Sequence, residues 1–462
     1  MAEILTNSKQ EKKEDYALEK VPPHYRMNWW SITNVTLGVA TAMIFMQMGS
    51  LMALSFGSVN ALLAEIYATV MAGALGIGIA YYAAKSGLNT NLMARGGGFG
   101  YIGASITSFI YAINFIMYCA IEGAIMASAV HEYLQVVPVW ALMVFFGLIV
   151  IPFNWFGMKQ LDKLQKWSLP IFIILLSAGI IAAANMAPVF KGSIWSFLPQ
   201  GAQAGGSALL TCIGIMNGLV GIMALLVSDY ARFIKKEEFK IGVFAVGFIP
   251  QLVCFFIMGL IGIWFGVRMG EANPGVYFVH VIGVGGALFT ILTQLRINIT
   301  NLYSASLSLS NFFEHVFNFK PGRTFWVAFT AIAAIAAMLA GALDHLGPML
   351  TFQGVFLFAW AAILVADAAV VKRTLKIGPQ YFEHRSEYLY PWNPVGVVSL
   401  LVSSIVGSLA AFGYMGVFLQ NIAAFFAAII GFVLTIVLAI ATKGKYYAKD
   451  SANDISYDEL VA

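Results

Sequence analysis

Charged residues are scarce in this 462-residue sequence, where Asp, Glu, Lys and Arg together make up 10% of the chain. A soluble domain carries about 25% charged residues, whereas 60% of this chain is hydrophobic. The scarcity of charge excludes a disordered chain, a nucleic-acid-binding protein and an ordinary soluble enzyme. The hydrophobic runs are long enough for membrane helices, while a membrane β-barrel would show short alternating strands. We therefore expect an all-α integral membrane protein.

Cysteine is scarce too, and the common motifs of metal and catalytic sites are absent. Cys119, Cys212 and Cys254 all lie in apolar runs and form no CxxC pair. This pattern excludes a disulfide framework and favours packing roles. The sequence contains no HExxH, GxSxG or phosphate-binding-loop motif, so we predict no enzyme activity, no cofactor and no metal site.

Twelve apolar stretches follow one another along the chain, and we number them spans 1 to 12. They lie near residues 30–56, 60–84, 100–130, 138–157, 167–187, 207–230, 240–267, 276–311, 324–342, 347–371, 394–416 and 420–442. Each is close to or above the roughly 20 residues that a membrane helix needs. We predict one twelve-helix domain over residues 29–442, flanked by cytoplasmic tails at 1–28 and 443–462.

The positions of Lys and Arg give the orientation in the membrane. Nearly all of the 26 Lys and Arg residues fall in the two tails or in loops on the same side as the tails. Lys191 and Arg268 lie on the opposite side, and Arg296 lies in the middle of span 8. Because cytoplasmic loops are enriched in Lys and Arg, we expect a multi-pass plasma (inner) membrane protein with both termini in the cytoplasm.

Two ionisable residues lie deep inside spans, where a charge is costly and marks a candidate functional site. Glu122 of span 3 shares a helical stripe with Asn114 and Tyr118. Arg296 of span 8 shares a stripe with Thr293, Thr300 and Ser304, and the neighbouring stripe carries Gln294, Asn298 and Asn301. We expect both stripes to face one interior cavity. The alternative is that Glu122 and Arg296 pair with each other, or hydrogen-bond to backbone groups, and only hold helices together.

Three further acidic residues lie closer to span ends, namely Glu65, Asp229 and Asp367. Arg232 follows Asp229 by about one turn, and Lys372 follows Asp367 in the same way. We expect these acidic groups to be satisfied near the membrane interface.

Spans 1 and 6 contain glycines that favour interrupted helices. Gly38 lies in span 1, and Gly214, Gly218 and Gly221 lie in span 6. Interruptions at matching places in two halves are typical of transporters built from inverted repeats. The spacing predicts two five-helix repeats, at about 30–187 and 207–371, with two extra helices at about 394–442. Close packing of the helices is the alternative explanation for the glycines.

Four segments resemble the nucleobase–cation symport family of purine and cytosine permeases. They are AKSGLNTNLMAR at 84–95 with FG at 99–100, SDYARF at 228–233, NITNLYS at 298–304, and AD at 366–367 with KR at 372–373. The resemblance implies a five-plus-five inverted repeat with discontinuous helices 1 and 6. It also implies alternating access around a midplane site between helices 1, 3, 6 and 8.

The same resemblance implies which residues of this chain correspond to the family's sodium site and which correspond to its substrate site. The family's sodium ligands fall on Arg296 and Ile297, with backbone carbonyls from Gly38 and Ala42 completing that site. The substrate positions are compared with those of the family's cytosine permease. Tyr118 falls where that permease has a tryptophan that stacks on the substrate, and Thr293 falls where it has an asparagine that binds the substrate. Leu219 and Ile222 fall where it has two serines of helix 6. The predicted substrate site comprises Asn114, Tyr118, Glu122, Asn217, Thr293, Gln294 and Asn298.

These positions predict a secondary transporter for a nucleobase or related planar nitrogen heterocycle, with purines favoured over cytosine. Because Arg296 occupies the sodium position, we expect proton coupling through Glu122 or sodium-independent transport. One alternative is a carrier of a small cationic or zwitterionic amine recognised by Glu122. Another is a membrane receptor that does not transport its ligand. The expected partners are the substrate, H+ and the lipid bilayer, and no nucleic acid.

Overall fold

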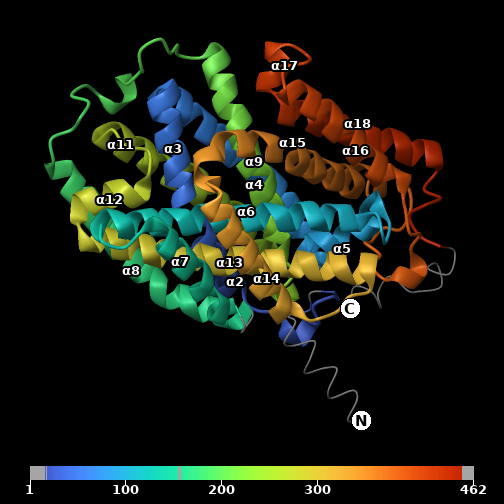
Figure 1. The fold of residues 1–462 in the computed structure, drawn as a ribbon. Coiled ribbons are helices and arrows are strands. Elements are labelled where there is room, and N and C mark those ends of the chain that lie inside the picture. Colours follow the sequence, from blue (N-terminus) through green and yellow to red (C-terminus); the bar gives the residue numbers. More distant parts are fainter. Residues whose placement is uncertain (1–15, 17, 155–157, 450–462) are drawn as a thin grey trace.

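The computed structural model describes residue 16 and residues 18–154 and 158–449. In this part of the chain the regular structure is helical, and Met27 and Ile234 form an isolated β-bridge. Figure 1 shows long helices packed side by side into one bundle, joined by short connections.

The described residues of the first half form seven α-helices and three shorter helical turns. They are η1 (Pro23–Tyr25), α2 (Trp29–Ala40), α3 (Met43–Phe56), α4 (Ser58–Ser86), α5 (Thr90–Ala94), η2 (Arg95–Phe99), α6 (Ala104–Tyr133), α7 (Val139–Phe153), α8 (Met158–Asn185) and η4 (Ile194–Ser196).

The helices of the second half follow after a loop. They are α9 (Gly206–Ala231), η5 (Lys236–Glu238), α10 (Phe239–Gln251), η6 (Leu252–Met258), α11 (Gly259–Met269), α12 (Pro274–Ile282), α13 (Val284–Phe317), α14 (Arg323–Leu339), η7 (Ala342–His345), α15 (Leu346–Val365), η8 (Ala366–Lys372), η9 (Ser386–Tyr388), α16 (Pro394–Ala411), α17 (Val417–Asn421) and α18 (Ala423–Thr442).

The expected all-α membrane fold is confirmed by the length and composition of these helices. Among the described residues, eight helical segments are long and apolar enough to cross a membrane, and the bent pair α2–α3 makes nine. Helices α7 and α14 are apolar but shorter. Helix α13 is 34 residues long and carries many polar side chains. The number of twelve crossings stays a prediction.

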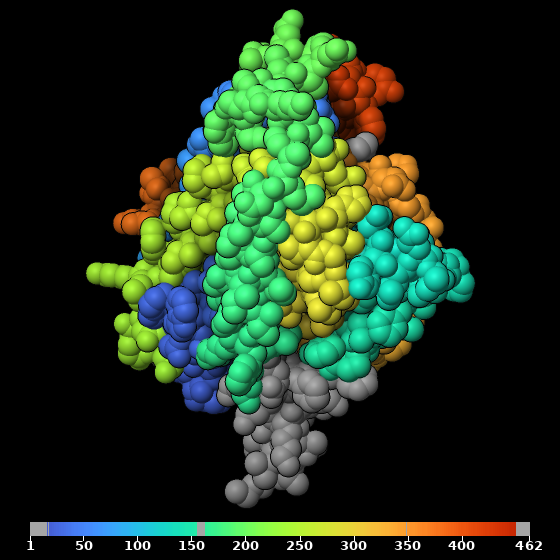
Figure 2. All heavy atoms as spheres, turned by 90° about the vertical axis from the view of Figure 1, so that its left-hand side faces the viewer, coloured from blue at the N-terminus to red at the C-terminus, as the bar shows by residue number. Residues whose placement is uncertain are grey.

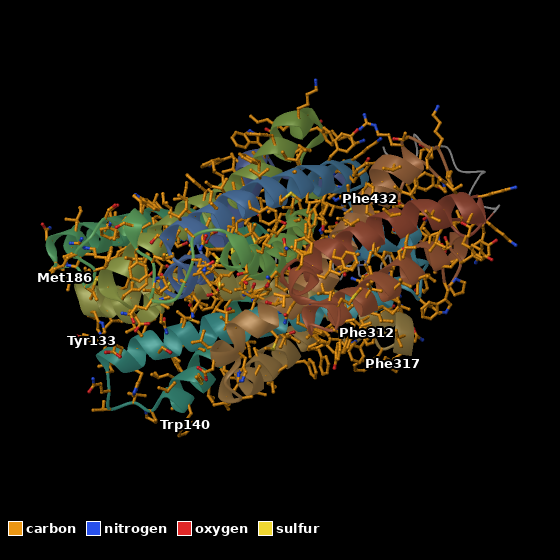
Figure 3. All side chains as sticks on the ribbon, turned by 90° about the horizontal axis from the view of Figure 1, so that it is seen from above. Tyr133, Trp140, Met186, Phe312, Phe317 and Phe432 are labelled. Carbon is orange, nitrogen blue, oxygen red and sulfur yellow. The ribbon has the colours of Figure 1, made fainter. Side chains whose placement is uncertain are left out.

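The outer surface of the bundle is apolar, as a lipid-facing surface must be. Helix α8 runs along the face seen in Figure 2, and its Trp167 and Ile174 are 80% and 65% exposed. Figure 3 shows Tyr133, Trp140 and Phe317 at the periphery of the bundle, and the Trp140 side chain is 62% exposed. A large apolar surface of this kind would be unstable in water.

Span 1 is broken, as predicted, between α2 and α3, which are bent by 42°. The break lies at Thr41 and Ala42, and Ala42 is extended with φ −64° and ψ 145°. The first amide of α3, from Met43, donates to Gln294 Oε1 at 3.1 Å. A side chain from α13 therefore satisfies a backbone group that the break leaves without a helical partner.

Span 6 is not broken, and the prediction of a discontinuous helix 6 is wrong for this structure. Helix α9 runs without interruption from Gly206 to Ala231. Its glycines serve close packing instead. A Cβ on Gly218 would lie 2.3 Å from the Leu350 carbonyl oxygen, and one on Gly221 would lie 2.7 Å from the Phe358 amide nitrogen. The glycines let α15 approach the backbone of α9, and this contact does not require a break.

The two halves of the bundle show related local features. The long helix α6 follows the short helix α5, and the long helix α13 follows the short helix α12. Both long helices are the third spans of the two predicted repeats, and they pack against each other. Helices α16 and α18, the predicted extra pair, pack together and against α15 at the edge of the bundle (Figure 1).

The described parts of the two tails lie at the same end of the bundle. Arg26 Nη1 donates to the carbonyl oxygens of Ala84 and Ile234 at 2.9 and 3.2 Å. At the other terminus, the Tyr447 hydroxyl donates to Asp367 Oδ1 at 2.5 Å. The tails thus contact the ends of α4, α9 and η8, while their cytoplasmic location stays a prediction.

Candidate functional site

A small cavity lies at the centre of the bundle, between the broken pair α2–α3 and helices α6, α9 and α13. It contains about 320 Å³ of empty space. Its wall combines the aromatic side chains of Phe45, Phe115 and Tyr118 with the polar side chains of Glu122 and Asn301. The remaining lining residues are aliphatic, namely Val39, Ala42, Ile44, Leu219, Ile222, Met223, Leu226 and Ile297. These helices belong to spans 1, 3, 6 and 8, where the site was expected.

Glu122 is buried at this wall and is bonded to Gln294. Gln294 Nε2 donates to Glu122 Oε2, and Gln294 Oε1 accepts from the Met43 amide at 3.1 Å. One amide side chain on α13 therefore connects the carboxylate of α6 to the start of α3. Glu122 and the break in span 1 therefore share the Gln294 side chain as a hydrogen-bond partner.

Tyr118 contributes its aromatic ring to the cavity. Its hydroxyl donates to Gln353 Oε1 of α15 at 2.8 Å. Phe115 lies one turn earlier on α6, and the two ring centroids are 6.3 Å apart. Since the hydroxyl is engaged by α15, Tyr118 presents an aromatic surface suited to stacking on a planar ligand.

Arg296 lies outside the cavity lining, against α8. Its Nε donates to Gln165 Oε1 at 2.6 Å, and its guanidinium carbon is 5.5 Å from the centroid of the Phe172 ring. Among the described residues, Nη1 and Nη2 of Arg296 have no hydrogen-bond partner, and no ion pair joins Arg296 to Glu122. The pairing alternative for these two charges is therefore absent from this structure.

The four predicted cation-site positions fall into two groups. Ala42 and Ile297 line the central cavity. Gly38 faces the Arg296–Gln165 contact, because a Cβ on Gly38 would lie 2.0 Å from Gln165 Nε2. The Gln165 side chain therefore fills the space over Gly38.

The other four predicted substrate residues make hydrogen bonds away from the cavity wall. Asn114 Nδ2 and Thr293 Oγ1 donate to carbonyls of their own helices, at 2.6 and 2.8 Å. Asn217 Oδ1 accepts from Tyr67 of α4 at 2.7 Å. Asn298 Nδ2 donates to the Cys119 carbonyl at 3.1 Å. Tyr118 and Glu122 are the predicted substrate residues that line the cavity as described.

Sequence reasoning missed several residues of this region. Phe45 and Phe115 lie inside apolar runs and give no distinguishing signal. Gln165 follows the charged residues of the loop before span 5, and only its distance from Arg296 in space reveals its role. Asn301 was not missed, since it belongs to the polar stripe of span 8 that was expected to face an interior cavity, and it lines the cavity wall.

The three acidic residues near span ends behave differently from one another. Asp367 forms the expected buried ion pair with Lys372, at 2.6 Å. Asp229 Oδ2 accepts from Ser304 at 2.7 Å and from Tyr111 at 3.3 Å, which ties α9 to α13 and α6. For Glu65 the expectation of a satisfied interfacial group is wrong, since both carboxylate oxygens are buried without a hydrogen-bond partner among the described residues.

Metal ligands do not gather anywhere in the described residues, where no group of three His, Cys, Asp or Glu side chains could hold an ion. A broken helix beside a buried cavity, inside a bundle of apolar helices, is the architecture of a secondary membrane transporter. Residues 20–449 match the protein family described as permease for cytosine/purines, uracil, thiamine, allantoin, and the chain belongs to that family. The chain is therefore a transport protein and not an enzyme.

Solved structures of transporters share the fold. Mhp1, a nucleobase-cation-symport-1 family transporter, in a closed conformation with bromovinylhydantoin bound, is 18% identical with a TM-score of 0.71, over 93% of this chain and 99% of that chain. Its inward-facing conformation gives the same identity and TM-score, over 94% and 97%. The Eremococcus coleocola manganese transporter, in complex with an aromatic bis-isothiourea substituted compound, is 15% identical with a TM-score of 0.55, over 92% and 98%. Comparison with curated protein sequences gave no match.

Proposed function

We propose that this protein is a secondary active transporter that takes up a nucleobase or related planar nitrogen heterocycle by alternating access, with purines preferred over cytosine. It acts in the plasma (inner) membrane with both termini in the cytoplasm. The observation that carries the proposal is the central cavity, in which aromatic rings and one buried carboxylate share a wall.

The lining of the cavity supports a small, flat ligand. The cavity is nearly closed in this structure, with about 20 Å³ of space that a water-sized molecule can occupy, so its walls must move apart to admit a ligand. Phe45, Phe115 and Tyr118 provide aromatic surface for stacking. Glu122 accepts hydrogen bonds, so it complements the ring N–H and amino groups that purines present. Leu219 and Ile222 line the positions where the resemblance places serines in cytosine permeases, and they offer no hydrogen bond to a small pyrimidine.

The surroundings of Arg296 support transport without sodium. Its guanidinium carries a permanent positive charge, and a second cation held nearby in a low-dielectric interior would be strongly repelled. Gln165 fills the space over Gly38, one of the carbonyl positions of the expected sodium site. Ile297 offers no ligand atom on its side chain. Substrate transport is then coupled to protons through Glu122, whose carboxyl can take up and release a proton as the cavity opens to water.

Uptake into proteoliposomes tests this proposal. We expect accumulation of radiolabelled adenine or hypoxanthine driven by an inward proton gradient and unchanged when sodium is replaced by choline. An excess of unlabelled guanine should compete, and cytosine should compete more weakly. Uptake that requires sodium would overturn the argument from Arg296. Competition by small amines with none by planar bases would favour the amine carrier, and saturable binding without uptake would favour a receptor.

A further inference from the structure

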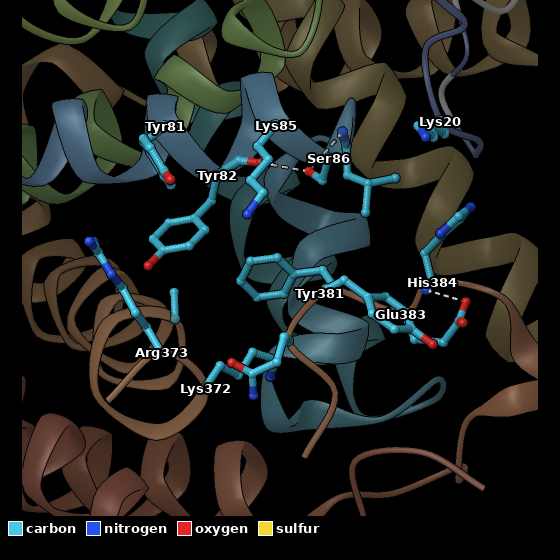
Figure 4. A pocket seen from close by; sticks show the side chains of 14 residues that line it. Lys20, Tyr81, Tyr82, Lys85, Ser86, Lys372, Arg373, Tyr381, Glu383 and His384 are labelled. Atoms are coloured by element: carbon cyan, nitrogen blue, oxygen red, sulfur yellow. Dashed lines mark hydrogen bonds between the residues drawn. The ribbon is translucent and has the colours of Figure 1, made fainter. Parts of the chain in front are cut away.

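Glu65 of α4 is a buried acidic residue to which the proposed transport gives no role. It is 1% exposed, and neither of its carboxylate oxygens has a hydrogen-bond partner among the described residues. The other buried acidic residues of the described chain each have a polar partner, namely Glu122, Asp162, Asp229, Asp367 and Glu383. Figure 4 shows one such contact at the opposite end of α4, where the backbone amide of His384 donates to Glu383 Oε1 at 2.9 Å.

The Glu65 carboxyl lies where α4 meets the junction of η6 and α11. A Cβ on Gly259, the first residue of α11, would lie 2.5 Å from the Glu65 carboxyl carbon. A Cβ on Gly49 of α3 would lie 2.3 Å from the carbonyl oxygen of the same Gly259. Helix α3 is the part of span 1 that follows the break. Glu65 is therefore buried at the contact between this part of span 1 and its neighbours α4 and α11.

Two buried thiols lie within electrostatic reach of Glu65, namely Cys212 of α9 and Cys254 of η6. The neighbouring helices α3 and α15 carry no ionisable side chain between Met43 and Phe56 or between Leu346 and Val365. A thiol never carries a positive charge, so neither Cys212 nor Cys254 can compensate an ionised carboxylate.

The other ionisable side chains on the elements around Glu65 have contacts of their own or lie far along their helices. The Tyr67 hydroxyl donates to an amide side chain of α9 at 2.7 Å. Arg268, near the end of α11, donates to a backbone carbonyl oxygen of α8 at 2.6 Å. Three more lie at the end of the bundle where the tails lie, namely Asp229 and Tyr230 of α9 and Lys240 of α10.

The surroundings of Glu65 suit a proton and no larger cation. An ionised carboxylate that is buried without a hydrogen-bond donor or a positive charge is strongly disfavoured, whereas the neutral acid is much less costly to bury. A metal cation would need several oxygen ligands. The described residues contain no group of three acidic, His or Cys side chains that could hold one.

A recess that water can enter lies next to this group, at the end of the bundle opposite the tails. It offers about 530 Å³ of space that a water-sized molecule can occupy, between the end of α3, the loop 200–203 and the start of α9. The loop is tied to α4, because Asn60 Nδ2 donates to the Gln203 carbonyl oxygen at 2.9 Å. Thr211 lines the recess and directly precedes Cys212. The recess thus ends beside the thiol that neighbours Glu65.

We propose that Glu65 is a second proton-binding site, and that its proton allows α3 to close against α4 and α11. The neutral carboxyl is buried over Gly259, as in this structure. When it releases its proton to the recess, the carboxylate requires water, so α3 must move away from α4 and α11 to admit it. The closed arrangement holds the proton more tightly than the open one, so acid favours closure and alkali favours opening. The proposal does not depend on the substrate or on Glu122.

Cys212 is a native reporter of this movement, because it is fully buried in the closed arrangement. The purified full-length protein is treated with a charged methanethiosulfonate reagent at pH 6 and pH 9, and peptide mass spectrometry measures the labelling of each cysteine. At pH 9 we expect Cys212 to react about tenfold faster in the wild type than in Glu65→Gln, whose neutral amide keeps α3 closed. At pH 6 the two proteins should react equally slowly. An ionised Glu65 would by itself slow the thiol, so faster labelling reports exposure.

Three controls accompany this comparison. Glu65→Asp retains an acid and should keep the fast labelling at pH 9. Asp344→Asn removes an exposed carboxylate of η7 and should behave like the wild type. Cys119 of α6 should label equally in wild type and Glu65→Gln. Equal labelling of Cys212 in wild type and Glu65→Gln at pH 9 would overturn the proposal. Protection of Cys212 by sodium, with choline as the comparison, would identify a metal cation and overturn the proton.

Hydrogen–deuterium exchange provides a second readout that needs no reactive thiol. After correction for the intrinsic pH dependence of exchange, the amides of α3 should exchange faster at pH 9 than at pH 6 in the wild type, and equally at both in Glu65→Gln. Exchange in α3 that is the same at both pH values in the wild type would overturn the proposal. Both measurements are made without substrate, so a failure of the proposed transport would leave their outcomes unchanged.

Discussion

Arg296 of α13 donates from Nε to Gln165 Oε1 of α8 at 2.6 Å, and Gly38 of α2 packs against the same Gln165 amide. This contact holds the one positive charge in the middle of span 8 away from Glu122. Gln294 is the partner of Glu122 instead. The sequence alone allowed Glu122 and Arg296 to pair with each other. In the structure they belong to two separate hydrogen-bonded groups.

The contact between Arg296 and Gln165 predicts a measurable coupling in stability. Arg296→Met and Gln165→Leu should each lower the melting temperature, because each leaves a buried polar partner unsatisfied at a cost of about 1–3 kcal/mol. The double variant should lose less than the sum of the two single variants. Thermal unfolding in detergent measures all four proteins. Strictly additive losses would show that the contact contributes nothing of its own.

Glu122→Gln should abolish proton-driven accumulation while leaving exchange of substrate across the membrane measurable. The amide keeps the shape of the side chain but cannot release a proton in the working pH range. Uptake at several external pH values, with and without a pH gradient, measures the effect.

The matched control for this change is Glu132→Gln, which removes a partly exposed carboxylate from the end of the same helix. It should keep the pH dependence of the wild type. Full pH-driven accumulation by Glu122→Gln would remove Glu122 as the proton carrier.

Gly218→Ala should destabilise the bundle. Its Cβ would lie 2.3 Å from the Leu350 carbonyl oxygen, so α9 and α15 would have to separate. Overpacking of this kind costs about 1–3 kcal/mol. Gly347→Ala, in the first turn of α15, adds a methyl group where nothing lies within 4 Å, and it should be tolerated. The melting temperatures of Gly218→Ala and Gly347→Ala in detergent test this prediction. Equal values would mean that the glycines of α9 are not needed for packing.

His384 predicts a loss of stability in acid. Burial lowers its pKa from 6.5 to about 4, so the unfolded chain binds more protons than the folded protein between these values. Stability is therefore complete above about pH 6.5 and falls as the pH drops towards 4.

The variant His384→Asn should reduce the difference in melting temperature between pH 7.5 and pH 5. His24→Asn removes an exposed imidazole from η1, and it should leave that difference unchanged. The prediction fails if His384→Asn is as acid-sensitive as the wild type.

Local features of the sequence were sufficient for the fold class, the family and several elements. Long apolar runs predicted the membrane helices because burial in lipid depends on composition along a single helix. The break in span 1 was predicted, although it lies at Thr41 and Ala42 and not at Gly38. The buried Asp367–Lys372 pair was predictable because the two residues are five apart on the same segment. The glycines of span 6 misled the prediction, since an interruption and close helix packing produce the same pattern.

The sequence by itself determined that this chain is a multi-pass transporter and that Glu122 and Arg296 are charges held inside the bundle. The tertiary structure alone decided their partners, because Gln294 is 172 residues from Glu122 and Gln165 is 131 residues from Arg296. Periodicity tells which residues share a face of one helix, but not which face of another helix meets it. Because of the way α6, α8 and α13 pack, the Glu122 carboxylate lies at the cavity wall, whereas the Arg296 guanidinium lies against α8, outside the cavity lining.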